Sequence, residues 1–408
     1  MRWVAAALLV AAATAGCTSE PASQISTIGP RLGTADALAA PGALSFRFAR
    51  LIGVDGLDRE VPDAVLDPAG DGGASCSPGA AIAVIVPLTG QASHFGPPIR
   101  DAAVAAVGEF TAANPACELE VKQFDTQTSD AGSLTAAKAV VADRSVIGVI
   151  GPVFSHEVDL IGDRFTEAGL AFASPSATAP GLVGPDSGFF RGLPNDRQIA
   201  ESGANYLTKR LGLSRVCVIE QEFPETELAA KTVRELVGQQ AVACSVQIGQ
   251  SLRADYRSEV DLVVEARADA VYFAGYAPQA AMFVRDLHQM APDVVFMGWE
   301  GVLDGDDFAR TAADSGRGTL AVGSFLPTAK HLQNPAATSS VDGSARYVTE
   351  AYELTTIMTQ GVGSGAVTDR ASMRAFLDGY VGDGPIRRYG WDDIGELEHP
   401  ELIVYEVG

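Results

Sequence analysis

Side chains that could bind a small charged molecule follow several apolar segments of this 408-residue sequence. Ser155 stands where a helix should begin, after the segment VIGVI at 146–150. A helix N-terminus offers free N–H groups and partial positive charge to an anion. Glu300 follows the segment VVFMG at 294–298, where a carboxylate could pair with a cation. The simpler alternatives are that Ser155 is a plain N-cap and that Glu300 is an exposed loop charge.

The sequence lacks the short motifs that mark the common catalytic sites. It has no G-x-S-x-G turn, no phosphate-binding loop with its lysine and no H-E-x-x-H pair. Ser155 and His156 are adjacent, but a catalytic base must approach the serine oxygen from the correct direction. The five histidines are scattered, at His94, His156, His288, His331 and His399. We therefore expect a protein that is not an enzyme, with no cofactor and no metal site.

From residue 80 onward, short apolar runs alternate with amphipathic stretches of helical length. This alternation predicts an α/β protein in which parallel sheets are covered by helices on both faces. About ten strands are too many for one compact sheet here, so we expect two doubly wound lobes. Ligands bind such sheets beyond the C-terminal ends of the strands. The expected strands begin at Ile82, Leu119, Val146, Leu170, Val216, Val242, Ala270 and Val294.

The amino-acid composition restricts the kinds of molecule that the protein can bind. The sequence has 29 basic and 51 acidic side chains, a formal net charge of −22, and 47% hydrophobic residues. So acidic a surface repels phosphate backbones and anionic membrane surfaces, which disfavours nucleic-acid binding. The hydrophobic fraction is sufficient for a substantial core.

The N-terminus has the pattern of an export signal. Arg2 is followed by the apolar run Val4–Ala13, which is too short to span a bilayer, and by small residues before Cys17. The ending Ala15-Gly16-Cys17 resembles a lipoprotein signal, although Thr14 stands where an aliphatic residue is preferred. This resemblance implies a lipidated Cys17; the alternative is an ordinary cleaved secretory signal. Either way, we expect the mature protein outside the cytoplasm.

The remaining cysteines, Cys76, Cys117, Cys217 and Cys244, suit an oxidising compartment. Four cysteines allow three pairings. Cys76 and Cys117 each precede one of two consecutive expected strands, and Cys217 and Cys244 lie in two later consecutive ones. We therefore favour the pairs Cys76–Cys117 and Cys217–Cys244, with four free buried thiols as the alternative.

Six segments at or after the expected strands carry a family resemblance: PLTGQASHFG at 87–96, GPVFSH at 151–156, SPSATAPGL at 174–182, FFRGLPNDRQ at 189–198, VYFAGYAP at 271–278 and FMGWEGV at 296–302. Each short motif is weak alone, but their order, their spacing and their position after expected strands are specific. From about residue 80 to its end, the chain resembles the leucine/isoleucine/valine-binding proteins of branched-chain amino-acid importers. This resemblance implies the type I periplasmic binding fold, with two lobes joined by three hinge crossings.

The resemblance also implies a binding site for a zwitterion. Ser155 matches the serine that holds the ligand α-carboxylate, and Ser176, Ala177 and Thr178 match a segment that contacts the carboxylate and the ammonium. Glu300 matches the acidic residue that pairs with the ammonium. A zwitterion removed from water needs a partner for each charge.

Aromatic residues complete the implied site. Tyr276 matches a tyrosine that lies over the ligand backbone and can donate a hydrogen bond, and Phe95 and Tyr347 match aromatics of the side-chain pocket. The alternative for each is ordinary core packing. The sequence departs from the family at Phe223, where a Tyr-Gly pair is frequent, and at Trp299, where a smaller residue is usual. Trp299, together with His94 and His156, could change the accepted side chain.

The expected organisation is a signal peptide at 1–16 and a lipid anchor with a flexible tether at 17–76. The N-terminal lobe is expected at 77–196 plus 327–385, and the C-terminal lobe at 197–326 plus 386–408. We expect a monomer, held to the membrane only by its lipid, that passes an amino acid to ABC permease subunits. The alternatives are a ligand without an ammonium group, such as urea or an amide, and a sensor built on the same fold.

Overall fold

A computed structural model describes residues 44–62, 64, 66–70, 73–74, 76–182, 184, 186–238, 241, 244–303, 307–326 and 346–408. The expected signal peptide and Cys17 lie outside these residues, as does His331. Within them, no helix combines the length and the apolar character that crossing a membrane requires.

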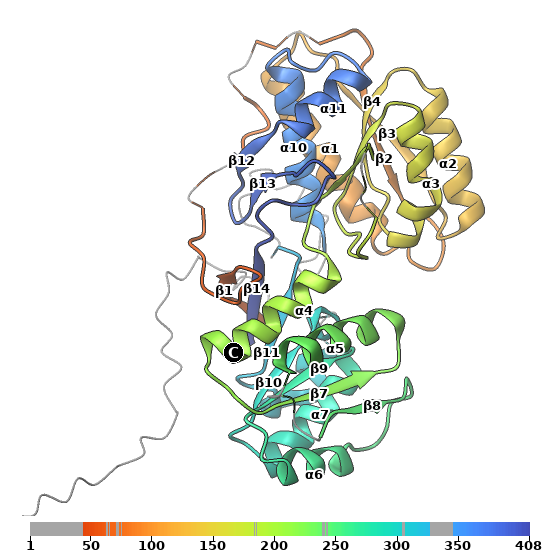
Figure 1. Cartoon of the computed structure of the whole chain (residues 1–408). Helices are drawn as coiled ribbons and strands as arrows, with labels where there is room; N and C mark the ends of the chain where they lie inside the picture. Colours follow the sequence, from red (N-terminus) through yellow and green to blue (C-terminus); the bar gives the residue numbers. More distant parts are fainter. Residues whose placement is uncertain are drawn as a thin grey trace, which may run out of the picture. The chain divides into compact units, whose positions relative to one another are not determined.

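The first of two main sheets in the described residues has five parallel strands (Figure 1). Its strand order is β3-β2-β4-β5-β6. The central strands are continuous apolar runs with every residue buried, as expected when helices cover both faces of a parallel sheet. The strands are β2 (Ala81–Val86), β3 (Glu120–Asp125), β4 (Val146–Ile150), β5 (Ala171–Ser174) and β6 (Phe189–Arg191).

Successive residues of β2 pack into different layers. Ile82 and Val84 pack with α1 (Gly96–Ala113), α10 (Val348–Gly363) and α11 (Arg370–Asp378). Ala83 and Ile85 point the other way, toward α2 (Asp130–Ala142) and α3 (Ser155–Glu167), which Figure 1 shows on the opposite face. This alternation is the two-residue period of a strand. We call this sheet and its helices the first lobe.

The second sheet has seven strands in the order β1-β14-β11-β10-β9-β7-β8. The strands β7, β8, β9, β10 and β11 are mutually parallel. Strand β14 is antiparallel to both of its neighbours, β1 and β11. The strands are β1 (Phe46–Ile52), β7 (Val216–Gln221), β8 (Val246–Ile248), β9 (Ala270–Ala274), β10 (Val295–Gly298), β11 (Leu320–Gly323) and β14 (Leu402–Val407).

Helices cover both faces of the second sheet. One face packs against α4 (Asp196–Asn205), the π-helix η1 (Tyr206–Arg210) and α5 (Pro224–Val237). The other face packs against three helices, and the remaining short elements are two 3-10 helices and a hairpin. These are α6 (Arg257–Glu265), α7 (Ala277–Met290) and α8 (Asp307–Ala312), then the 3-10 helices η3 (Glu300–Leu303) and η4 (Ala313–Gly316), and the hairpin strands β12 (Val381–Asp383) and β13 (Arg388–Gly390). We call the second sheet and its helices the second lobe.

From β2 onward, the chain passes between the two lobes three times, after β6, after β11 and after β13. The predicted α/β class, with two helix-covered and mainly parallel sheets, is therefore confirmed. Of the strand expected from Val242, the described residues Val246–Ile248 form β8 and pair with β7. The lobe limits given in the sequence analysis stay a prediction.

One apolar segment within the predicted tether at 17–76 docks onto the second sheet. Phe46–Ile52 forms β1, which pairs with β14 at the edge of the second sheet. Leu51 and Ile52 are fully or almost fully buried there. The sequence of this segment is apolar enough to dock, but it does not specify which strand it joins.

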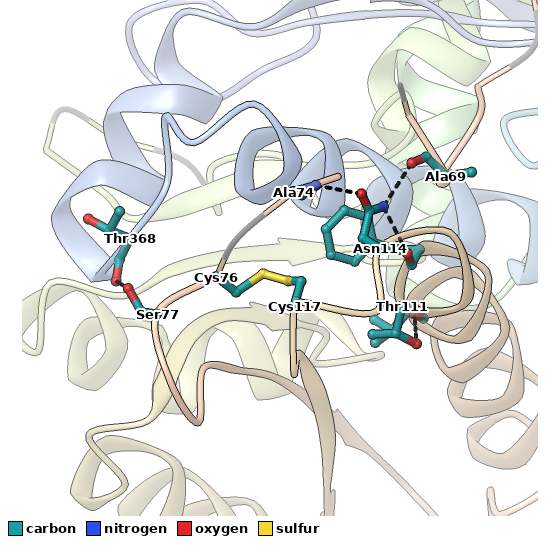
Figure 2. Close-up of a disulfide and its surroundings, with 10 residues drawn as sticks. Ala69, Ala74, Cys76, Ser77, Thr111, Asn114, Cys117 and Thr368 are labelled. Atoms are coloured by element: carbon teal, nitrogen blue, oxygen red, sulfur yellow. Dashed lines mark hydrogen bonds between the residues drawn. A yellow bond between two sulfur atoms is a disulfide. The ribbon is translucent and has the colours of Figure 1, made fainter. Parts of the chain in front are cut away.

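The two disulfides join Cys76 to Cys117 and Cys217 to Cys244, the pairs favoured from the order of the strands. Their Cα–Cα distances of 4.6 Å and 5.5 Å lie in the range that disulfides require. Figure 2 shows the first of them, which joins the segment before β2 to the segment after α1.

Candidate functional site

The residues predicted to bind a ligand lie where strands of both sheets end. Phe95 follows β2, Ser155 follows β4, and the segment from Ser176 to Thr178 follows β5. In the second lobe, Phe223 follows β7, Tyr276 follows β9 and Glu300 follows β10. Tyr347 directly precedes α10, in a left-handed conformation. These positions are the C-terminal ends of parallel strands, as predicted for a binding site.

Ser155 is the first residue of α3 and is not its N-cap. The N-cap is Phe154, whose backbone N–H donates to the Glu157 carboxylate at 3.2 Å. The Ser155 hydroxyl oxygen accepts a hydrogen bond from the Ala179 N–H at 3.1 Å. The plain N-cap role is therefore wrong, and the hydroxyl instead links the start of α3 to the loop after β5. Its hydrogen donates no bond within the described part of the chain, and it lies beside the positive end of the helix dipole.

The loop after β5 is held by its own hydroxyl groups. Ser176 donates to the Val153 carbonyl at 2.7 Å, and the Ala177 N–H donates to the Ser174 hydroxyl at 3.0 Å. The Thr178 carbonyl accepts from the Asp196 N–H at 2.9 Å. The Ser176 hydroxyl hydrogen is thus already used within the protein, so direct binding through it would require this bond to break.

Arg191, at the end of β6, holds the same loop from the other side. It is fully buried and donates to the Ala177 carbonyl at 2.7 Å and to the Ala179 carbonyl at 3.0 Å. Its third bond, at 2.9 Å, reaches Glu396. Arg191 was not among the residues predicted to form the site. The only signal was an arginine at the end of the apolar segment FFR.

Aromatic rings cluster at the same ends of the first-lobe strands. Phe95 contacts Phe154 edge to face at 5.9 Å and Tyr347 at 6.3 Å between ring centroids. Phe325 contacts Tyr347 at 6.0 Å. His94 lies 4.1 Å from Phe95, but its side chain is exposed. The predicted pair of Phe95 and Tyr347 is therefore brought together, and Phe154 and Phe325 join it without having been predicted.

In the second lobe, Glu300 is 7% exposed and begins η3. Its Oε2 atom accepts from the Ser324 N–H at 2.6 Å and from the Ser324 hydroxyl at 2.5 Å. Both donors are neutral, so they fix the carboxylate without cancelling its charge. Burial of a carboxylate is costly unless a cation compensates it. The loop-charge alternative, which requires an exposed side chain, is therefore wrong.

Asp196, the first residue of α4, lies close to Glu300 and was not among the predicted site residues. The pKa of Asp196 is raised to about 7, chiefly by burial and also by the charges of Glu300 and Glu225. A hydrogen bond with Thr178 and the charge of Arg191 oppose this rise in the pKa. Two other carboxylates thus act on Asp196, and a bound cation would relieve this repulsion.

Tyr276 does not have a free hydroxyl, because it donates a short hydrogen bond to Glu225. Its backbone N–H donates to the Gln221 side chain at 2.9 Å. The ring packs edge to face with Phe223 at 5.2 Å and with Trp299 at 6.2 Å. Trp299 itself is 5% exposed and packs in the second-lobe core, beside the Tyr276 ring.

Arg387 connects this site to the three passages between the lobes. It is fully buried and donates to the Gly192 carbonyl at 2.9 Å, to the Ser324 carbonyl by a short bond and to the Glu401 carbonyl at 3.4 Å. Gly192 follows β6, Ser324 follows β11, and Glu401 lies between β13 and β14, so each acceptor is in a different passage between the lobes. Ser324 also donates to the Glu300 carboxylate. Ser324 therefore joins Glu300 to Arg387 at the passage after β11. Sequence reasoning missed Arg387 too.

A cavity of about 750 Å³ lies elsewhere, between α11 and the segments around Arg144 and Gly169. None of the predicted site residues lines it. Arg370, on its wall, donates to four backbone carbonyls and so has a structural role. The strand ends, which carry Ser155 and the buried Glu300, offer a charged ligand more suitable partners than this cavity does.

Within the described ranges, no group of three His, Cys, Asp or Glu side chains could hold a metal ion.

The raised pKa values predict how stability depends on pH. Burial raises the pKa of Glu350 to about 7 and that of Glu353 to about 8, as it does for Asp196. For a carboxyl group whose pKa is raised on folding, the stability it contributes is complete below its unfolded pKa and is lost as the pH rises through the folded value. We expect the ligand-free protein to become less stable from pH 5 to pH 8, by about 3 kcal/mol from Asp196 alone.

Urea unfolding at pH 5, 6, 7 and 8 measures this dependence. The Asp196→Asn variant should show a flatter profile than the wild type, because the substituted side chain does not ionise. A free energy of unfolding that increases from pH 5 to pH 8 would contradict the assignment of raised pKa values.

Comparison with known proteins identifies the family of this chain. Residues 80–401 match the family model described as periplasmic binding protein. The chain is 26% identical over 340 residues to the leucine-, isoleucine-, valine-, threonine-, and alanine-binding protein of Pseudomonas aeruginosa, covering 80% of this chain and 89% of that protein.

Two solved structures share the fold. The branched-chain amino acid transporter substrate binding protein of Streptococcus pneumoniae, in complex with isoleucine, matches with a TM-score of 0.64 and 18% identity, covering 81% of this chain and 99% of that one. A solute binding protein of an ABC transporter from R. palustris, in complex with 4-hydroxybenzoate, matches with a TM-score of 0.61 and 18% identity, covering 81% and 93%. The family match over most of the chain establishes that this protein belongs to the periplasmic binding protein family.

Proposed function

We propose that this protein is an extracytoplasmic solute-binding lipoprotein of an ABC importer and captures an amino acid, branched-chain or similar, between its two lobes. The observation that carries this proposal is the buried Glu300 beside Asp196, two carboxylates whose mutual repulsion a ligand ammonium would relieve. The amino-acid-binding relative from P. aeruginosa supports the same ligand class.

The two ends of a zwitterion have chemically suitable partners on different elements. The ammonium would bind Glu300 and Asp196. The carboxylate would accept the Ser155 hydroxyl hydrogen and backbone N–H groups at the start of α3, where the helix dipole favours an anion. Arg191 and Ser176 would keep the loop after β5 in position for both ends.

The ligand side chain would lie against Phe95, Phe154 and Tyr347. These rings are half-buried, so each has surface left to cover. Phe223 and Tyr276 would close the site from the second lobe. Contact with both lobes favours the closed arrangement, which permease subunits could then recognise.

The aromatic contact predicts a selective effect of Phe95→Ala. Loss of a ring that covers an aliphatic side chain should cost about 2 kcal/mol, or roughly 30-fold in affinity for isoleucine. Affinity for alanine, whose side chain is too short for this contact, should change less than about threefold. Isothermal titration with both amino acids measures the difference. Equal losses for the two ligands would show that Phe95 supports the fold instead.

Thermal melts of ligand-stripped protein with a panel of amino acids, urea and simple amides test the proposed ligand class. A ligand present at about a hundred times its dissociation constant adds roughly 2.7 kcal/mol. At about 2–4 °C per kcal/mol, the midpoint should rise by about 5–10 °C. A shift with urea or amides alone would favour a ligand without an ammonium group. The relative bound to 4-hydroxybenzoate makes this second class a specific alternative.

Membrane attachment and delivery need their own test. We propose that Cys17 carries the lipid, that the protein acts as a monomer and that ABC permease subunits receive its ligand. Radiolabelled palmitate should be incorporated into the wild type in cells and not into Cys17→Ser. Unchanged labelling of the variant would contradict lipidation at Cys17. Unimpaired ligand uptake in a strain that lacks this protein would favour a role as a sensor.

A further inference from the structure

We propose that the segment 44–79, which we call the strap, is a fourth connection between the lobes and limits how far they separate. The strap lies outside the family match, which begins at residue 80. The proposal rests on the proposed function only in assuming that lobe movement accompanies ligand capture. It extends that function by assigning a role to a segment that the resemblance does not cover.

The first part of the strap is anchored in the second lobe. Strand β1 pairs with β14 from Phe46 opposite Val407 to Ile52 opposite Leu402. The turn that follows packs on the end of α4, where the Asn205 side chain donates to the Val54 carbonyl at 2.8 Å. This approach is so close that a Cβ atom on Gly56, which has a positive φ, would lie 2.3 Å from the Tyr206 nitrogen.

The last part of the strap is anchored in the first lobe. Leu66 and Ala74 are buried in the core formed with α1 and α10. Asn114, which is 1% exposed at the end of α1, donates to the Ala69 carbonyl at 2.9 Å and accepts from the Ala74 N–H at 2.8 Å (Figure 2). The disulfide between Cys76 and Cys117 follows directly. This anchor is therefore both hydrogen-bonded and covalent.

The segment between the two anchors is short. Val61 packs against the cluster that contains residues of β1, β11 and β14, and Leu66 already lies in the first-lobe core. The five Cα–Cα steps between them span at most about 18 Å. Opening of the lobes must stay within this limit unless one anchor detaches.

A short tether restricts the open arrangements more than the closed one, so it favours closure. In the loop-closure relation, the cost of bringing two ends together grows as three halves of RT times the logarithm of the linker length. Eight added residues would lengthen the linker from the four residues 62–65 to twelve. Because both arrangements hold the linker ends, this relation sets an upper limit, and we expect ligand affinity to weaken by at most about fivefold.

The test inserts eight Gly and Ser residues after Pro62, which leaves both anchors intact. Spin labels at Ala139→Cys on α2 and Asp261→Cys on α6, both exposed, report the distance between the lobes. Without ligand, the insertion should give a longer and broader distance distribution than the parent. The matched control carries the same insertion after Ser251, in a loop within the second lobe, and should keep the parent distribution.

A second pair of variants tests the covalent anchor. Cys76→Ser with Cys117→Ser should also broaden the ligand-free distances, because the first-lobe anchor loses its crosslink. Cys217→Ser with Cys244→Ser removes a disulfide inside one lobe and should leave them unchanged. Identical ligand-free distances in the parent and in the Pro62 insertion would overturn the proposal. Since these distances require no ligand, failure of the strap and failure of the amino-acid assignment are distinguishable.

Discussion

The Glu300→Gln variant is expected to lose at least about 100-fold in affinity for its amino acid. The substitution keeps the size of the side chain and an oxygen that can accept from Ser324, but it removes the charge that the ammonium needs. Removing one partner from a buried ion pair costs about 3–5 kcal/mol, and 1.4 kcal/mol is a tenfold change in affinity. Isothermal titration of ligand-stripped protein at pH 8, where Asp196 is ionised, measures the loss.

Glu265→Gln is the matched control for this variant. Glu265 is an exposed residue at the end of α6, so its substitution removes the same charge far from the strand ends. We expect its affinity to stay within about threefold of the wild type. A Glu300→Gln variant that binds as tightly as this control would mean that the ammonium is held elsewhere.

The Arg191→Met variant is expected to lose about 3–5 kcal/mol of folding free energy. The methionine keeps most of the volume, but Glu396 loses its ion-pair partner and two carbonyls of the loop after β5 lose their donor. Unsatisfied buried acceptors add to this cost. Urea unfolding at pH 7 gives the difference, and ligand affinity should fall with it because Ala177 and Ala179 lie in the binding loop.

A double-mutant cycle separates the ion pair from the loop contacts. Arg191→Met with Glu396→Gln should be more stable than Arg191→Met alone, because the uncompensated carboxylate is gone. Affinity should remain low in the double variant, since the loop still lacks its donor. A single variant whose stability lies within about 1 kcal/mol of the wild type would contradict this role of Arg191.

The sequence was sufficient to predict most of the fold because its central strands are unambiguous. Val146–Ile150 and Ala270–Ala274 are apolar runs of strand length between helical stretches, and both form as expected. Strand β1 could not be placed, because its partner β14 lies at the other end of the chain. Pairing over that separation depends on tertiary structure, which a local pattern does not contain.

The sequence could predict only those candidate site residues that come soon after the end of an expected strand. Ser155 and Glu300 were predicted because they follow expected strands and match binding residues of the family that the chain resembles. Arg191, Asp196 and Arg387 were missed, because charged residues are usually exposed and only tertiary contacts reveal that these three are buried. Likewise, the sequence could not reveal that the hydroxyls of Ser176 and Tyr276 already donate within the protein.

The central claim is that the ligand is held by both of its charges, at Glu300 with Asp196 and at the start of α3. The most direct test titrates ligand-stripped protein calorimetrically with leucine, with 4-methylpentanoate, which lacks the ammonium, and with isopentylamine, which lacks the carboxylate. The structure predicts that leucine binds and that each one-charge analogue binds at least about 100-fold more weakly, because a buried partner is left uncompensated. Binding of 4-methylpentanoate as tight as that of leucine would contradict the ammonium site and the proposed ligand class.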